Sequence, residues 1–293
     1  MRWSRGHRSR NVEDRRHQSG GGGAGAASLL QLLIYVGRSR VGLIGIVVFF
    51  LFMWFAGVDP LALLSGGGVS SPGNTAARDA AEEELVEFVH WLLDDVQGTW
   101  QQILAGSNTP YRDATLVLFR DQVRSACGFA QAASGPFYCP GDHNVYIDLG
   151  FYDELRRGFG APGDFAQAYV IAHEIGHHVQ ALLGIESQVR RMQRDRPADA
   201  NALSVLMELQ ADCFAGVWGH YADTQGILEP GDLEEGLAAA AAIGDDRIQR
   251  SGGRTVNPDG FTHGSSAQRV EWLRRGFDAG SPSACDTFSA AGR

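Results

Sequence analysis

The pentapeptide His173-Glu-Ile-Gly-His177 constrains this chain more than any other feature of its sequence. On a helix, residues four apart project from one face and lie about 6 Å apart along the axis, so two imidazoles can bind one metal ion. Glu174 lies about 100° round the same helix, beside the ion but not on it. From there it can take a proton from a water molecule that zinc has made more acidic. The pattern therefore predicts a zinc site with its own general base.

The residues around the pentapeptide predict a buried helix. No proline interrupts residues 163–184, where Asp164 is the expected N-cap and Gly184 the expected stop. Apolar side chains recur at spacings of three and four along one stripe: Phe165, Ala168, Ala172, Ile175, Val179 and Leu182. Charged and polar groups are costly to bury in such a helix unless something binds them. Burial thus favours a zinc site over a chance match, which is the alternative for an isolated motif of this kind.

A third ligand is expected from a second helix. A catalytic zinc site takes three protein ligands and leaves one position open. Metzincins use a histidine six residues after the second ligand, and Leu183 at that position excludes the class. Glu208, in the helical stretch 201–218, is the expected ligand. Asp212 follows one turn later and can accept the outer N–H of a zinc-bound imidazole. The alternative makes both carboxylates solvent-facing helix charges.

Three separated blocks resemble the bacterial neutral zinc metallopeptidase family. They are His-Glu-Ile-Gly-His-His at residues 173–178, Glu-Leu-Gln-Ala-Asp-Cys at 208–213, and Thr-His-Gly-Ser-Ser-x-Gln-Arg at 262–269. The resemblance covers roughly residues 75–288 and leaves the basic, glycine-rich N-terminus outside. It implies a zincin-like metallopeptidase of the glutamate-ligand subclass in a membrane-proximal, extracytoplasmic setting. It does not supply a substrate.

A membrane anchor is expected before the domain. Residues 41–58 are a run of 18 uncharged residues, long enough to cross a hydrocarbon core of about 30 Å. Arg38 and Arg40 precede the run and Asp59 follows it, so the positive-inside rule places the N-terminus in the cytoplasm and the domain outside. A cleavable signal peptide is the alternative, but the run is long, begins late and has no clear cleavage site after it. We therefore expect a single-pass protein of the bacterial cell membrane.

Four regions follow from this reading. Residues 1–40, with eight arginines against Glu13 and Asp14, are expected to be a largely disordered cytoplasmic tail, and the transmembrane anchor follows. Residues 59–77 read as a flexible linker and residues 78–293 as the zinc metallopeptidase domain. The basic tail lacks interleaved aromatic residues, so no nucleic-acid partner is expected.

The cysteines are expected to form two disulfides. All four follow the apolar run, where an oxidising compartment would pair them. Of the three possible pairings, we expect Cys127–Cys139, around a short loop, and Cys213–Cys285, which ties the C-terminus to the helix of Glu208. Free buried thiols are the alternative. Cys213 lies about 140° round the helix from Glu208, so it is not an expected metal ligand.

The remaining pattern predicts an α+β domain that is predominantly helical with a small sheet. Helices are expected over residues 79–104, 186–196, 232–249 and 265–277, and strands over residues 115–119 and 144–148. In zincins an edge strand holds extended substrate by backbone pairing. Residues 145–148, which shortly precede the metal helix, are the candidate for that edge.

Two further histidines have weaker cases. His178 points about 100° away from the zinc face, so a structural or rim position is expected. His263 lies in a glycine-flanked turn, where a structural role is expected, and the family resemblance makes it a candidate to stabilise the oxyanion of the reaction. Asp245 suggests no more than an internal ion pair.

The favoured function is a zinc endopeptidase. One zinc ion held by His173, His177 and Glu208 would polarise the scissile carbonyl, while Glu174 would take a proton from water and return it to the leaving amine. The expected partner is a peptide or protein substrate. The alternative is a non-catalytic, zinc-stabilised extracytoplasmic binding or scaffold domain. An intact Glu174 favours the peptidase, because a base beside an open zinc position has few structural uses.

Overall fold

The computed structural model describes residues 1–17, 72–131, 135–157 and 163–292. The chain divides into two compact units, of which the first comprises Met1–His17 and Glu84–Arg293 and the second Gln18–Glu83. The strands and both disulfides lie in the first unit. The expected membrane anchor, residues 41–58, lies outside the described residues. Among those that are described, no helix is both long and apolar enough to cross a membrane.

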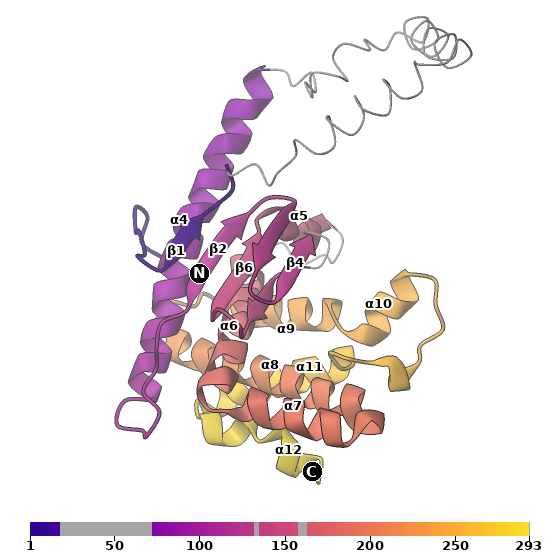
Figure 1. Ribbon diagram of the computed structural model, residues 1–293. Helices are drawn as coiled ribbons and strands as arrows, with labels where there is room; N and C mark the ends of the chain where they lie inside the picture. Colours follow the sequence, from indigo (N-terminus) through magenta and orange to yellow (C-terminus); the bar gives the residue numbers. More distant parts are fainter. Residues whose placement is uncertain (18–71, 132–134, 158–162, 293) are drawn as a thin grey trace, which may run out of the picture. The chain divides into compact units, whose positions relative to one another are not determined.

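Four strands form a mixed sheet in the order β1-β2-β6-β5. They are β1 (Val12–Asp14), β2 (Thr115–Phe119), β6 (Asn144–Asp148) and β5 (Phe137–Cys139). β2 pairs in parallel with both β1 and β6, whereas β5 runs antiparallel to β6. A separate antiparallel hairpin consists of β3 (Gln122–Ser125) and β4 (Gly128–Gln131). Figure 1 shows the sheet beside the helices that carry the site.

Both faces of β2 are buried, which explains its uninterrupted apolar sequence. Leu116 and Leu118 pack in the main core with side chains of the helices. Val117 and Phe119 point to the other face and pack with Val123 of the hairpin. The strands expected at residues 115–119 and 144–148 are confirmed.

The predicted substrate edge is wrong. Residues 145–148 belong to β6, which lies inside the sheet between β2 and β5. The edge strand next to them is β5, a strand of three residues that is too short to give an alternating pattern.

The other elements are helical, so the predominantly helical α+β class is confirmed. The α-helices are α4 (Pro72–Ile103), α5 (Gly150–Arg157), α6 (Asp164–Leu182), α7 (Ile185–Asp195), α8 (Ala200–Thr224), α9 (Asp232–Ala242), α10 (Asp245–Ser251), α11 (Ser266–Ala279) and α12 (Thr287–Ala290). Short 3-10 turns are η2 (Pro197–Asp199), η3 (Pro258–Gly260) and η4 (Pro282–Cys285). Helices α6 and α11 both pack on α8, and α9 packs on α6 and α11.

Two details of the predicted helices are corrected. Asp164 is the first residue of α6 and Gly163 is its N-cap, since the carboxylate of Asp164 is used elsewhere. Residues 232–249 form two helices, not one. The helix is interrupted at Gly244. A Cβ atom at this position would lie 2.4 Å from the backbone nitrogen of Ser266, so only glycine allows the two backbones to come this close.

The two expected disulfides are present. Cys127–Cys139 joins the hairpin to the end of β5, and Cys213–Cys285 joins α8 to η4. Cys213 is thereby committed to a disulfide and is not a metal ligand.

Residues 1–17 are folded, in contrast to the expected disordered tail. They contribute β1 to the sheet and belong to the same compact unit as residues 84–293. The domain boundary expected at residue 78 therefore omits a strand. Little in the sequence indicated a strand here, because β1 has three residues, two of which are charged.

Candidate metal and catalytic site

Helices α6 and α8 bring the three expected ligands together. His173 Nε2 lies 3.1 Å from Glu208 Oε2, and His177 Nε2 lies 3.4 Å from Glu208 Oε1. One ligand atom from each residue lies within 4.8 Å of the others. Two imidazole nitrogens and one carboxylate oxygen are a typical donor set of catalytic zinc sites. The residues therefore fit the ion that their spacing predicts.

Small residues at the crossing allow the two helices to approach. A Cβ atom on Gly176, between the two histidines, would lie 3.0 Å from the carbonyl oxygen of Ala211 and 3.1 Å from its Cα. The backbones therefore meet with almost no side chain between them. This contact sets Glu208, one turn before Ala211, opposite both imidazoles.

Glu174 lies in the same cavity as the three ligands. It is buried, with 8% of its surface exposed, and its carboxylate forms no hydrogen bond with any described residue. The carboxylate is thus close to the ligands and retains its capacity to accept a proton.

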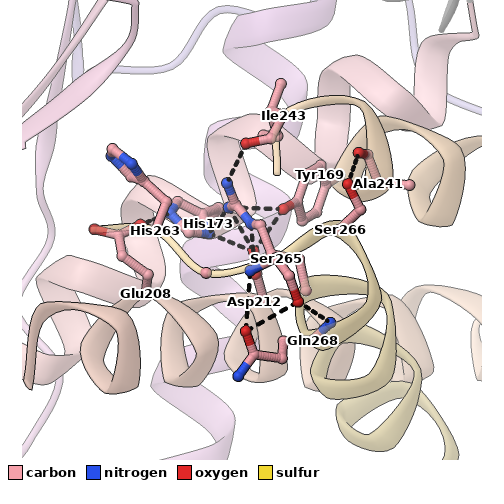
Figure 2. Close-up of polar contacts among 12 residues, drawn as sticks. Tyr169, His173, Glu208, Asp212, Ala241, Ile243, His263, Ser265, Ser266 and Gln268 are labelled. Carbon is pink, nitrogen blue, oxygen red and sulfur yellow. Dashed lines mark hydrogen bonds and ion pairs between the residues drawn. The ribbon is translucent and has the colours of Figure 1, made fainter. Parts of the chain in front are cut away.

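Hydrogen bonds within a network of charged residues hold the imidazole of His173 at its Nδ1 atom (Figure 2). Its Nδ1 lies 2.8 Å from Asp212 Oδ1, the same oxygen to which Tyr169 donates its hydroxyl at 2.5 Å. Arg269 donates to both oxygens of Asp212, from Nε at 2.8 Å and from a terminal nitrogen at 2.9 Å. Asp212 and Arg269 are almost fully buried, so this ion pair is protected from solvent. With Asp212 accepting at Nδ1, the Nε2 atom of His173 is directed towards Glu208.

His177 is held by a neutral group. Its Nδ1 lies 2.9 Å from the amide oxygen of Gln180, which is completely buried. The amide nitrogen of Gln180 donates to the carbonyl of Met207 at 2.8 Å and to Gln210 at 3.0 Å. A partner on α8 thus fixes the Gln180 side chain, and Gln180 fixes the second imidazole.

The carboxylates and imidazoles of the site stabilise one another's charged forms. Burial alone would lower the pKa of His173, but Asp212 and Glu208 outweigh it and raise the value to about 10. Burial alone would raise the pKa of Asp212, but Arg269 and His173 lower it to about 2. The pKa of His177 is raised by Glu208 against burial, and that of Glu208 is well below its usual value because of the two histidines. Protons on the imidazoles therefore compete with a metal ion for their nitrogens.

His263 lines the same cavity, on a loop that Asp245 organises. Asp245 Oδ2 accepts the backbone N–H groups of Thr262, His263 and Gly264 at 2.7, 2.7 and 3.1 Å. Its Oδ1 lies 3.2 Å from Nδ1 of His263, whose ring is half exposed. The Asp245 carboxylate therefore holds the backbone of this loop in place by hydrogen bonds. The sequence did not indicate this structural role. The loop leads into α11, where Ser265 and Gln268 form a capping box.

His178 lies apart from the ligands, as its direction on the helix predicts. It is buried, with Nδ1 3.1 Å from the hydroxyl of Tyr138 and Nε2 2.6 Å from the carbonyl of Arg112. Its role is structural, because it joins α6 to β5 and to the segment before β2.

The site opens into a cavity of about 550 Å³. The edge strand β5 forms one wall with Phe137 and Tyr138, and Phe151 of α5 lies beside it. Ile243 and Ile248 also line the cavity. The cavity is therefore lined by both apolar and charged side chains, and the charged ones include Glu154, Glu186 and Arg190 besides the ligands and Glu174.

Sequence reasoning missed three residues of this site: Tyr169, Gln180 and Arg269. Tyr169 and Gln180 lie on α6, four residues before His173 and three after His177, so their helical spacing was a usable signal. Arg269 closes the block at residues 262–269 but is separated from Asp212 by 57 residues. Nothing in its local pattern showed that it would be buried.

Comparisons with known proteins agree with this geometry. The model of the family described as "Putative neutral zinc metallopeptidase" matches residues 1–288. The "Uncharacterized protein YpfJ" of Escherichia coli (strain K12) is 49% identical over 289 residues, which cover 98% of this chain and 99% of the relative. The "Uncharacterized protein Rv2575" of Mycobacterium tuberculosis (strain H37Rv) is 41% identical over 255 residues, covering 80% and 84%. No solved structure matches. The family match includes the N-terminal residues that the resemblance left outside.

Proposed function

The chain belongs to the neutral zinc metallopeptidase family, and we propose that it hydrolyses peptide bonds with Glu174 as general base. The observation that carries the proposal is the meeting of His173, His177 and Glu208 in a cavity that also holds Glu174. Three ligands leave one coordination position for solvent or substrate. When bound, one zinc ion would polarise a carbonyl group and make a water molecule acidic near neutral pH.

Glu174 would move the proton of the reaction. Its carboxylate is buried beside the ligands and is free of hydrogen bonds to the described residues, so it can accept a proton from water. The same carboxyl group can then donate that proton to the amine that leaves. A catalytic acid and base of this kind contributes about 10²–10⁴-fold to a rate.

His263 would stabilise the negative charge that develops on the carbonyl oxygen of the substrate. Its Nδ1 side is held by Asp245, which leaves Nε2 as the atom available to the cavity. A hydrogen-bond donor held in advance by the protein needs little reorganisation during the reaction. Asp245 would be a positioning residue for this imidazole.

The edge strand β5 would hold the substrate in an extended conformation. β5 pairs with β6 on one side and ends the sheet on the other, and two of its residues line the cavity. An exposed strand edge binds extended peptides through main-chain hydrogen bonds. The aromatic side chains of Phe137 and Tyr138 on this strand then favour peptides with large apolar side chains near the scissile bond.

The proposed setting is the outside of the bacterial cell membrane. Two disulfides are typical of an oxidising compartment, and residues 41–58 are proposed to attach the chain to the membrane.

Cleavage of unfolded casein and of a peptide library by the Glu174→Gln variant tests the proposal. The variant should keep one zinc ion per chain and lose about 10²–10⁴-fold in cleavage rate, because the amide cannot accept the proton. Glu154→Gln is the matched control, since Glu154 lies on the exposed rim of the same cavity. Unchanged cleavage by Glu174→Gln at full zinc content contradicts the mechanism. Chelator-insensitive cleavage contradicts the metal dependence.

A further inference from the structure

We propose that residues 1–17 are a built-in part of the peptidase unit and lie on the same side of the membrane as residues 84–293. The proposal goes beyond the proposed function, because it concerns how the chain is placed and not what the site does. It replaces the expectation that the N-terminus is cytoplasmic while the domain is outside. Backbone hydrogen bonds, side-chain packing and ion pairs join the two described segments.

Backbone hydrogen bonds join the segment to the sheet. β1 pairs in parallel with β2 in a register that matches Val12 with Leu116 and Asp14 with Leu118. The amide of Leu116 donates to the carbonyl of Asn11 at 2.7 Å, and the amide of Arg15 donates to the carbonyl of Leu118 at 2.8 Å. β1 therefore covers an edge of β2 that would otherwise present unpaired backbone groups.

Side chains of the segment pack along helix α4. The backbone amide of Ser9 donates to Nδ1 of His90 at 3.0 Å, and the hydroxyl of Ser9 donates to Asp94 at 2.6 Å. The rings of Trp3 and Phe88 meet edge to face with their centroids 5.5 Å apart. Ser9 is buried, so these contacts belong to the interior of the unit.

The start of the segment reaches the metal-binding half of the fold. The α-amino group of Met1 lies 2.8 Å from Asp164, the first residue of α6, and 3.3 Å from both Glu229 and Asp232. The backbone of Arg2 donates to the carbonyl of Ile227 at 2.8 Å. The segment thus connects the sheet, α4 and the beginning of the helix that carries His173 and His177.

The arginines that suggested a cytoplasmic tail have partners in the fold. Arg2, Arg5 and Arg8 form ion pairs with Glu229, Glu84 and Glu87 of the domain, in that order. Their charges complement an acidic surface of the same unit. The positive-inside rule counts basic residues near a membrane segment without regard to such pairing. Arg2, Arg5 and Arg8 therefore give little information on sidedness, whereas Arg38 and Arg40, on which the expected orientation rests, lie outside the described residues.

The short distances between the two segments decide on which side of the membrane each segment lies. Hydrogen-bonded strands lie about 4.8 Å apart, whereas a hydrocarbon core is about 30 Å thick. Residues 1–17 and 84–293 cannot make these contacts from opposite sides of a bilayer. A single crossing between them, as expected for residues 41–58, would separate them. The two segments must therefore lie on the same side of the membrane.

Cysteine labelling of the 293-residue chain in spheroplasts tests the proposal. Ser4→Cys and Gln225→Cys each introduce one exposed thiol, in the N-terminal segment and after α8 respectively. A membrane-impermeant maleimide is added before or after detergent permeabilisation. We expect both thiols to react under the same condition. Reaction of one thiol in sealed spheroplasts and of the other only after permeabilisation overturns the proposal.

The controls separate this test from the proposed function. The parent chain should remain unlabelled, because its four cysteines form the two disulfides. Labelling is repeated in the Glu174→Gln background, where the result should be the same whether or not peptides are cleaved. As a second measurement, Ser9→Cys and Asp94→Cys in one chain should form a disulfide link on mild oxidation, since Ser9 Oγ lies 2.6 Å from Asp94 Oδ1. Absence of this link in protein with normal zinc content also overturns the proposal.

Discussion

The two zinc-ligating imidazoles proposed on α6 are held in different ways. His173 is backed by Asp212, whose charge is balanced by the buried guanidinium of Arg269. His177 is backed by the neutral amide of Gln180. One partner is ionic and couples α6, α8 and α11, whereas the other is uncharged and couples α6 to α8. The loss of the His173 partner should therefore affect both zinc affinity and the free energy of unfolding. The loss of Gln180 should affect mainly zinc affinity.

Removal of Asp212 should have the largest effect. Asp212→Ala leaves Arg269 buried without its counter-charge, so we expect a loss of about 3–5 kcal/mol in the free energy of unfolding. It also removes the acceptor of His173 Nδ1 and should lower zinc affinity about 10–100-fold. Urea unfolding and competition with a zinc chelator measure the two effects. A variant as stable as the parent chain would contradict the ionic anchor.

Removal of Arg269 should have a smaller effect on stability. In Arg269→Met, Asp212 keeps Tyr169 and His173 as donors, so we expect a loss of about 2–3 kcal/mol in the free energy of unfolding. Arg269→Lys retains the charge but not the two-pronged geometry, and its stability should fall between those of the parent and Arg269→Met. If the lysine variant were the less stable of the two, charge balance would not be the cause.

Replacement of Gln180 should affect metal binding more than stability. Gln180→Met keeps the size of the side chain but removes the acceptor of His177, so zinc affinity should fall about tenfold. The lost hydrogen bonds to Met207 and Gln210 should cost about 1–2 kcal/mol. The same unfolding and competition measurements apply. A stability loss equal to that of Asp212→Ala would remove the contrast between the two imidazoles.

The pH dependence of zinc binding should show the smallest difference. Asp212 and Glu208 raise the pKa of His173 to about 10, so zinc must displace a proton at neutral pH and its affinity should rise with pH. Asp212→Asn removes a negative charge, lowers the pKa of His173 and should move this rise to lower pH, whereas Gln180→Met should not. Zinc titration between about pH 6 and 10 measures the shift. Identical profiles in the three proteins would contradict the ionic coupling.

Part of the fold and of the site could be predicted from the sequence, because the relevant residues lie close together along the chain. The spacing of His173 and His177, and the same-face relation of Glu208 and Asp212, follow from helix geometry and agree with the structure. The strand at residues 115–119 showed itself by its apolar run. The cysteine pairing agreed because one pair encloses a short loop and the other ties down the C-terminus.

The rest depended on contacts between distant residues. Arg269 gave no local sign of burial, because its counter-charge lies on another helix. β1 and β5 have three residues each, which is too few for a strand pattern. The break at Gly244 interrupts a sequence that reads as continuous helix, and it is required only because Ser266 packs against that glycine.

The most direct test of the central claim is zinc K-edge X-ray absorption on protein purified without chelator. We predict one zinc ion per chain with two imidazole nitrogens and a carboxylate oxygen among its ligands, and loss of the oxygen donor or of the metal in Glu208→Ala. Sulfur ligation, or the same spectrum with full zinc content in Glu208→Ala, would contradict the assignment of His173, His177 and Glu208 as the metal site.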